Sequence, residues 1–121
     1  MNPLQRFSTG IKELDEILGG GIPEYSVNII AGEPGSGKTI LAQQIAFSNA
    51  MKGKKSLYLT TLSEPPLKLI RYQSQFSFFD ESLVSKQVFF RDVAEAFKQK
   101  GMQAGLEEIM RIVKEIQPNF I

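Results

Sequence analysis

The sequence predicts an α/β fold in which a mainly parallel sheet is flanked by helices. Short apolar, β-branched runs alternate along the chain with longer segments whose apolar residues repeat at helical spacing. A glycine-rich stretch at residues 32–39 connects the first of these runs to the first long helical segment. A strand–helix–strand order of this kind implies parallel crossovers. The 121 residues suffice for one small domain with a modest core.

The composition excludes several classes of chemistry. There is no cysteine and no histidine, so disulfides, a thiol nucleophile and the usual zinc ligands are excluded. The 14 basic and 13 acidic residues nearly balance, so the charge indicates neither nucleic acid nor a membrane surface as a partner. No apolar run approaches the length of a membrane span, and residues 1–6 lack the apolar core of a signal peptide. A cytoplasmic location is therefore expected.

The N-terminal segment predicts a short helix followed by a strand. The helix is indicated by four apolar residues at helical spacing, Ile11, Leu14, Ile17 and Leu18. Ser8 or Thr9 is expected to cap its start, and residues 19–21 with Pro23 are expected to end it. Residues 25–31, with the sequence YSVNIIA, then predict a buried strand.

Residues 32–39 fit G-x-x-x-x-G-K-[ST], the phosphate-binding P-loop, in the expected place between a strand and a helix. Its glycines allow backbone N–H groups to turn toward phosphate oxygens at the positive end of a helix dipole. Lys38 would reach the outer phosphates, and the Thr39 hydroxyl would bind Mg²⁺. The predicted nucleotide-binding residues are Gly32, Glu33, Pro34, Gly35, Ser36, Gly37, Lys38, Thr39 and Ile40.

The segments that follow the loop alternate as the fold requires. Residues 40–47 predict a helix with Leu41, Ala42, Ile45 and Ala46 on its apolar face. Residues 56–62 predict a strand, and a helix with Pro66 in its first turn follows it. Residues 87–90 predict another strand, which ends at a solvated pair formed by Arg91 and Asp92.

The C-terminal part predicts one long amphipathic helix and the start of a further strand. Residues 93–101 are polar and helix-prone, and residues 117–121 resemble the beginning of a strand. The helix between them is predicted to cover the sheet with an apolar stripe formed by Met102, Leu106, Ile109, Met110, Val113 and Ile116.

The phrase T-G-I-x-x-L-D-x-I-L-G-G-G-I-P at residues 9–23, followed by a strand and the P-loop, resembles the start of a KaiC-type ATPase domain. That family belongs to the RecA-like branch of P-loop proteins. The resemblance implies Mg²⁺ and ATP as ligands, with Lys38 also catalytic, and homo-oligomers that bind nucleotide between subunits. It also implies that residues 1–121 are the N-terminal part of one RecA-like domain, ending before the Walker B Asp.

In KaiC-like proteins the second strand ends in two glutamates, followed by a small residue, a proline and a helix. When Pro66 is set on that proline, Glu64 takes the place of the second glutamate and Ser63 replaces the first. Glu64 is therefore the candidate to orient or deprotonate the attacking water, because it follows a strand beside the P-loop strand. The alternative is an acidic residue that merely favours a helix N-terminus.

Several functions remain open from the sequence. The first is an ATPase coupled to regulation or signalling through oligomer assembly. The second is a nucleotide-binding regulatory module without hydrolysis, which Ser63 and the missing Walker B Asp favour. A KaiC-type serine/threonine kinase is a third. A small-molecule kinase of the adenylate-kinase type shares G-x-P-G-S-G-K, but such chains usually open directly with the P-loop strand. DNA recombination, as in RecA relatives, would rest on fold alone.

Overall fold

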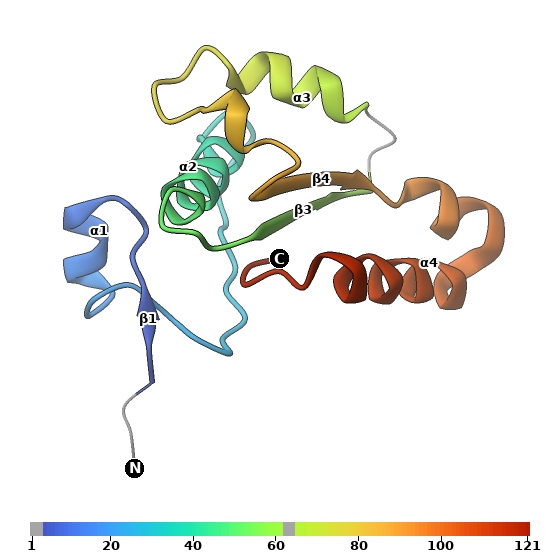
Figure 1. Cartoon of the computed structure of the whole chain (residues 1–121), viewed down its shortest axis with the longest axis horizontal. Coiled ribbons are helices and arrows are strands. Elements are labelled where there is room, and N and C mark those ends of the chain that lie inside the picture. The colour runs from blue at the N-terminus through green and yellow to red at the C-terminus, as the bar shows by residue number, and fades with distance from the viewer. Residues whose placement is uncertain (1–3, 62–64) are drawn as a thin grey trace.

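The computed structural model describes residues 4–61 and 65–121, and the described part is a mixed α/β structure with two small sheets (Figure 1). An antiparallel pair is formed by β1 (Arg6–Phe7) and β2 (Ile22–Pro23). A parallel pair is formed by β3 (Ser56–Thr60) and β4 (Val88–Asp92). The other elements are α1 (Lys12–Ile17), α2 (Lys38–Ala50), α3 (Pro66–Gln73), the 3₁₀ turn η1 (Glu81–Leu83) and α4 (Ala94–Ile116).

The parallel pair confirms the predicted direction of the sheet. Its register runs from Ser56 opposite Val88 to Thr60 opposite Asp92, and α3 lies in the crossover between the strands. On the other edge of β3, Ser56 forms a parallel bridge with Phe120, whose carbonyl accepts a 2.9 Å hydrogen bond from the Leu57 N–H. The predicted start of a further strand at the C-terminus is thus confirmed.

The helices cover the two faces of this sheet and create two apolar clusters. On one face, Phe47 and Ala50 of α2 pack with Val88 and Phe90 of β4, and α3 adds Leu69 and Ile70. On the other face, α4 packs Ile112 and Ile116 against Leu57 and Val93. Figure 1 shows α3 and α4 on opposite sides of the strands. Successive strand residues point to opposite faces, so each strand contributes to both clusters.

Helix α4 is longer than the sheet it covers. It has 23 residues and is interrupted at Gly101, whose φ of 83° and ψ of −174° are not helical. Its C-terminal half packs on the strands, whereas three residues predicted as core are exposed: Met102, Leu106 and Met110. That part of the prediction is wrong because the side of the helix that faces the sheet carries Gly105, Ile109, Ile112 and Ile116, and Leu106 and Met110 lie beside that stripe.

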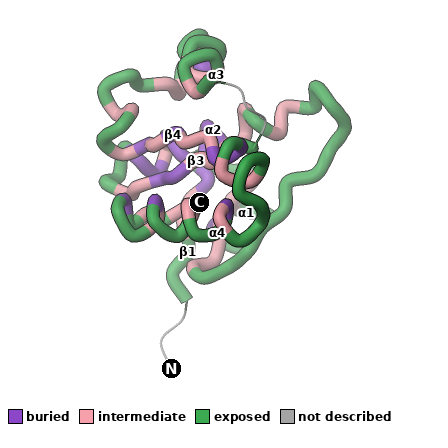
Figure 2. The backbone as a smooth tube through the Cα atoms, turned by 90° about the vertical axis from the view of Figure 1, so that its right-hand side faces the viewer, coloured by how far each residue is buried: buried purple, intermediate pink, exposed green. Residues whose placement is uncertain are grey.

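Residues 25–31 are not the buried strand that their composition predicts. Residues 26–31 have no regular secondary structure, and Val27 and Ile29 are 96% and 89% exposed. In Figure 2, which colours the backbone by burial, most of the long loop outside the labelled elements is exposed. A strand requires a hydrogen-bonded neighbour. Within the described residues, β3 is already flanked by β4 and Phe120, so its edges do not offer that neighbour.

The N-terminal signature folds around the side chain of Asp15. Its Oδ1 accepts hydrogen bonds from the Thr9 N–H at 2.8 Å and the Thr9 hydroxyl at 2.6 Å, and its Oδ2 accepts one from the Ser8 hydroxyl. The prediction that Ser8 or Thr9 is the cap residue of α1 is therefore wrong. Ile11 is the N-cap residue, and the carboxylate, a stronger acceptor, takes both hydroxyls.

This segment then docks onto α2. The Asn49 amide donates to the Ser8 carbonyl at 2.9 Å, and a Cβ at Gly10 would lie 2.4 Å from the Ser48 Oγ. Glycine at position 10 therefore permits the close approach of the two segments. Among residues 4–61 and 65–121, no helix combines the length and the apolar character needed to cross a bilayer.

Candidate functional site

The P-loop residues form a tight turn that ends in helix α2. The Ser36 N–H donates to the Glu33 carbonyl at 3.1 Å, and Gly35 has a φ of 81°. Gly37 is the N-cap residue of α2 and adopts a left-handed conformation with a φ of 96° and a ψ of 17°. A side chain would be strained at that angle, which explains why glycine is required directly before the helix.

The N-terminus of α2 offers backbone donors without a competing side chain. Gly37 provides no side-chain cap, and the first turn contains no acidic residue. The first N–H groups of a helix lack intrahelical acceptors, and they lie at the positive end of the helix dipole. An anion can therefore bind at this end through backbone N–H groups, as the motif predicts.

The side chain of Lys38 folds over the loop. Its Nζ donates to the Gly32 carbonyl at 2.6 Å and to the Glu33 carbonyl at 3.0 Å. These carbonyls belong to the loop itself, so the positive charge is held at the mouth of the turn. A bound phosphate would offer charged oxygen atoms in place of these neutral acceptors, and charge-assisted hydrogen bonds are the stronger kind.

Thr39 lines a small cavity at the carboxyl end of the parallel strands. The cavity has a volume of about 130 Å³ and is lined by Thr39, Tyr58, Thr60, Pro65, Pro66, Leu69, Phe90 and Arg91. These residues come from α2, β3, the start of α3 and β4. The sequence analysis predicted that Thr39 belongs to the site and that the site lies at the carboxyl end of the strands. It did not indicate Tyr58 or Thr60 as site residues.

The donor set near Thr39 suits Mg²⁺ only together with a nucleotide. Within the described residues, no group of three or more carboxylate, histidine or cysteine side chains could hold a metal ion. Mg²⁺ prefers oxygen ligands and usually keeps several waters while it binds phosphate oxygens. The Thr39 hydroxyl fits one position of such a shell, and the phosphates and water would supply the others.

Glu64, the predicted catalytic carboxylate, lies outside the described residues, as does Ser63. The structure describes the two elements that flank them: β3 ends at Thr60 and α3 begins at Pro66. Both ends line the same cavity as Thr39. The role of Glu64 therefore stays a prediction.

Buried polar groups near the site were missed by the sequence analysis. Gln43, one helical turn after Thr39, is fully buried, and neither its amide nitrogen nor its amide oxygen has a hydrogen-bond partner among the described residues. The Thr60 Oγ1 is likewise buried without a partner. The predicted apolar face of α2 omitted Gln43, although its position four residues before Phe47 places both on the face that packs on the sheet.

Comparison with known proteins identifies one family. The family description "ATPase: KaiC" matches residues 7–121. The chain is 38% identical to a UPF0273 protein of Pyrococcus horikoshii over 70% of this chain and 34% of that protein. It is 40% identical to a UPF0273 protein of Thermotoga maritima over 60% of this chain and 30% of that protein.

A shorter stretch of the chain matches a DNA repair protein. The DNA repair protein RadA of Mycobacterium tuberculosis is 48% identical over 52 residues, which are 43% of this chain and 11% of that protein. The chain thus spans about a third of the length of the UPF0273 relatives and less of RadA. Because the family match runs from residue 7 to residue 121, nearly the full sequence, the chain belongs to the KaiC family of ATPases.

Proposed function

We propose that the chain binds Mg²⁺-ATP through its P-loop and that the family domain to which it belongs hydrolyses the nucleotide. The observation that carries this proposal is the open N-terminus of α2, with Lys38 held over the loop by two carbonyls. In this proposal backbone N–H groups from residues 35–40 surround the outer phosphates. Lys38 neutralises their charge, and Thr39 ligates the metal ion.

Hydrolysis is proposed to depend on Glu64. A carboxylate that follows a strand at the carboxyl edge of the sheet can orient a water for in-line attack on the terminal phosphate. Bound Mg²⁺ would supply charge neutralisation on the phosphate oxygens. With Ser63 in the place of the first family glutamate, a nucleotide-binding module with little or no hydrolysis is the second candidate function.

The binding claim is tested by calorimetric titration of Mg²⁺-ATP into the 121-residue chain and its Lys38→Ala variant. We expect the variant to lose at least 100-fold in affinity, since about 3 kcal/mol is at stake when a charge-assisted contact is removed. Lys12→Ala, on the exposed surface of α1, is the matched control and should bind normally. Equal affinities for Lys38→Ala and the unmodified chain would refute the site.

Hydrolysis is tested separately by the release of phosphate. Glu64→Gln should leave ATP affinity unchanged and lower turnover at least 100-fold, as expected when a general base is removed. Binding without turnover by the unmodified chain would support the regulatory module. Equal turnover by Glu64→Gln and the unmodified chain would show that Glu64 is not catalytic and is only an acidic residue favoured at a helix N-terminus.

Assembly and downstream role are extensions of the proposal. The family resemblance supports a homo-oligomer with nucleotide between subunits, and regulation through its assembly. The RadA match adds DNA repair as an alternative process, although a net charge of +1 gives no electrostatic support for DNA binding. A protein-kinase activity is a third outcome, and transfer of labelled phosphate to protein would reveal it.

A further inference from the structure

We propose that two copies of the chain form a symmetric dimer through the exposed side of the C-terminal part of α4, residues 102–116, with the two helices antiparallel. The partner of this surface is the same surface of a second copy, which makes the contact isologous. The dimer requires no nucleotide, so it is independent of the function proposed above. An exposed apolar row and two opposite charges beside it support this contact.

The apolar part of the surface is a row of three side chains. Met102, Leu106 and Met110 are 69%, 48% and 55% exposed and lie four residues apart, so they share one side of the helix. The helix turns a different side to the sheet, where Ile112 and Ile116 are buried. In Figure 1, no other described element lies on the side of α4 away from the strands. The row is therefore open to a partner.

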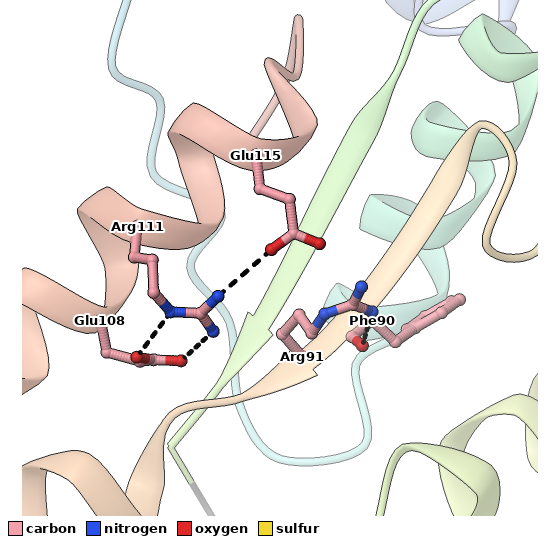
Figure 3. A network of polar contacts seen from close by, with 5 residues as sticks. All are labelled: Phe90, Arg91, Glu108, Arg111 and Glu115. Atoms are coloured by element: carbon pink, nitrogen blue, oxygen red, sulfur yellow. Dashed lines mark hydrogen bonds and ion pairs between the residues drawn. The ribbon is translucent and has the colours of Figure 1, made fainter.

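Most charges on this part of α4 are paired within the helix. The Arg111 guanidinium lies 2.5 Å from a Glu108 oxygen and 3.3 Å from a Glu115 oxygen, as Figure 3 shows. Within the described residues, Glu107 and Lys114 take part in no ion pair. Both side chains are exposed, so their charges are available to a second copy.

The charged residues at the end of β4 are held by backbone groups instead. The Arg91 Nη1 donates to the Phe90 carbonyl at 3.0 Å, which Figure 3 also draws. Asp92 accepts a 2.8 Å hydrogen bond from the Ala94 N–H. The predicted solvated pair of Arg91 and Asp92 is therefore wrong, and the proposed surface takes its charges from α4 alone.

Glu107 and Lys114 flank Met110 along the helix. Glu107 comes three residues before Met110 and Lys114 four residues after it, and residues at these spacings are neighbours on a helix surface. Their own separation is close to two turns, so both charges lie along the same edge of the apolar row. The Glu107 carboxylate accepts a 3.3 Å hydrogen bond from the Gln103 amide, which leaves its charge uncompensated.

This order of charges favours an antiparallel dimer. A two-fold axis near Met110 places Glu107 of each copy opposite Lys114 of the other, so that two ion pairs form across the interface. A parallel dimer in register would set like charges against each other. Rows of residues four apart pack at about −50°, so the contact concentrates around Leu106 and Met110 at the crossing point. Met102 is about 12 Å from Met110 along the helix and lies toward the edge of the contact.

Sedimentation equilibrium of the 121-residue chain without nucleotide tests the dimer. The background for all variants is Val27→Asp/Ile29→Asp, which removes the other exposed apolar group. We expect a reversible monomer–dimer equilibrium. Met110→Asp places an unpaired charge at the crossing point and should weaken the dimer about 20-fold or more, whereas Met102→Gln should have a smaller effect. Circular dichroism checks that each variant stays folded.

Exchange of the two charges tests the antiparallel arrangement. Glu107→Lys and Lys114→Glu, each alone, should weaken the dimer about 5-fold or more, because both ion pairs become repulsive. An equimolar mixture of the two variants should dimerise again, since every contact between unlike copies joins opposite charges. Glu13→Lys and Lys12→Glu make the same charge changes on the exposed surface of α1 and should leave dimerisation unchanged, alone or mixed.

Three results would each overturn the proposed dimer. The first is a chain that stays monomeric in the Val27→Asp/Ile29→Asp background. The second is a dimer of undiminished strength in Met110→Asp, which would place the contact elsewhere. The third is a mixture of the Glu107→Lys and Lys114→Glu variants that associates no more than either variant alone.

Discussion

Asp15 shows how one residue turns a sequence signature into structure. Its carboxylate accepts hydrogen bonds from both hydroxyls and one N–H of the Ser8–Thr9 pair, and Thr9 is fully buried. The pKa of Asp15 is lowered from its ordinary value of 3.8, first by the Ser8 hydroxyl and then by Thr9. The T-G-I-x-x-L-D motif therefore has a structural role, the hydrogen bonding of the Ser8–Thr9 turn by Asp15, which its similarity to the KaiC family does not by itself explain.

A pH dependence follows from this lowered pKa. The contribution of Asp15 to stability is complete above pH 3.8 and is lost as the pH falls through the lower pKa of the folded state. Asp15→Asn should therefore lower the free energy of unfolding at pH 7, and the difference from the unmodified chain should shrink below pH 3.8. Urea unfolding at several pH values measures this. Glu16→Gln is the control, and a difference that does not vary with pH would contradict the assignment.

The buried hydroxyls of Ser56 and Thr60 in β3 have no hydrogen-bond partner among the described residues, and this permits a prediction about stability. Removing a buried hydroxyl that has no partner abolishes a desolvation cost of about 1–3 kcal/mol. Ser56→Ala and Thr60→Val should therefore each raise the stability of the ligand-free chain by about 1 kcal/mol, a few degrees in melting temperature. Thermal unfolding without nucleotide tests this. A drop in melting temperature would show that the hydroxyls have partners in solution.

At the scale of elements, the sequence correctly predicts the helices and strands whose spacing of apolar residues agrees with the face that packs on the sheet. Helix α2 begins at Lys38, directly after Gly37, and β3, β4 and α3 lie where their composition places them. The prediction of a strand at residues 25–31 is wrong for a physical reason. β-branched residues are suited to a sheet, but a strand forms only where a neighbouring strand is available for hydrogen bonding. Composition contains no information about the neighbour.

The candidate site likewise has one part that the sequence predicts and one part that it does not. The P-loop is contiguous, so its motif predicts both the turn and the donors of α2. The cavity is assembled from four elements, and Thr60 and Arg91 meet Thr39 only through the packing of β3, β4 and α3. Gln43 is buried for the same reason, since its helix face meets the sheet. Such tertiary neighbours cannot be inferred from one local pattern.

The exposed segment 25–31 should contribute little to the stability of this chain. Val27 and Ile29 are almost fully exposed, whereas Phe47 is completely buried between α2 and β4. The double substitution Val27→Thr/Ile29→Thr should change the free energy of unfolding by less than about 0.5 kcal/mol, as is usual for surface positions. Phe47→Ala should cost about 3–5 kcal/mol. Denaturant unfolding gives both numbers, and a large cost for the double variant would mean that the segment is paired in solution.

At the scale of the whole molecule, the candidate site gathers at one end of the sheet. The last residues of β3 and β4, the start of α3 and the N-terminus of α2 all meet at the cavity. Ligands in α/β sheets bind at the carboxyl ends of the strands, because helix N-termini and loops converge there. The carboxyl edge of the parallel pair thus lies beside the start of α2, where the proposed P-loop donors are.

The distribution of exposed apolar residues predicts self-association of the 121-residue chain. Val27 and Ile29 form one exposed group, and Met102, Leu106 and Met110 form a second along α4. Contiguous apolar surface of this kind favours association, and the net charge of +1 gives little repulsion against it. Sedimentation velocity should show an average mass that rises with protein concentration. Val27→Asp/Ile29→Asp should reduce association through the first group, and Met102→Gln/Met110→Gln through the second. Lys12→Gln serves as a surface control, and a monomer at all concentrations would contradict the prediction.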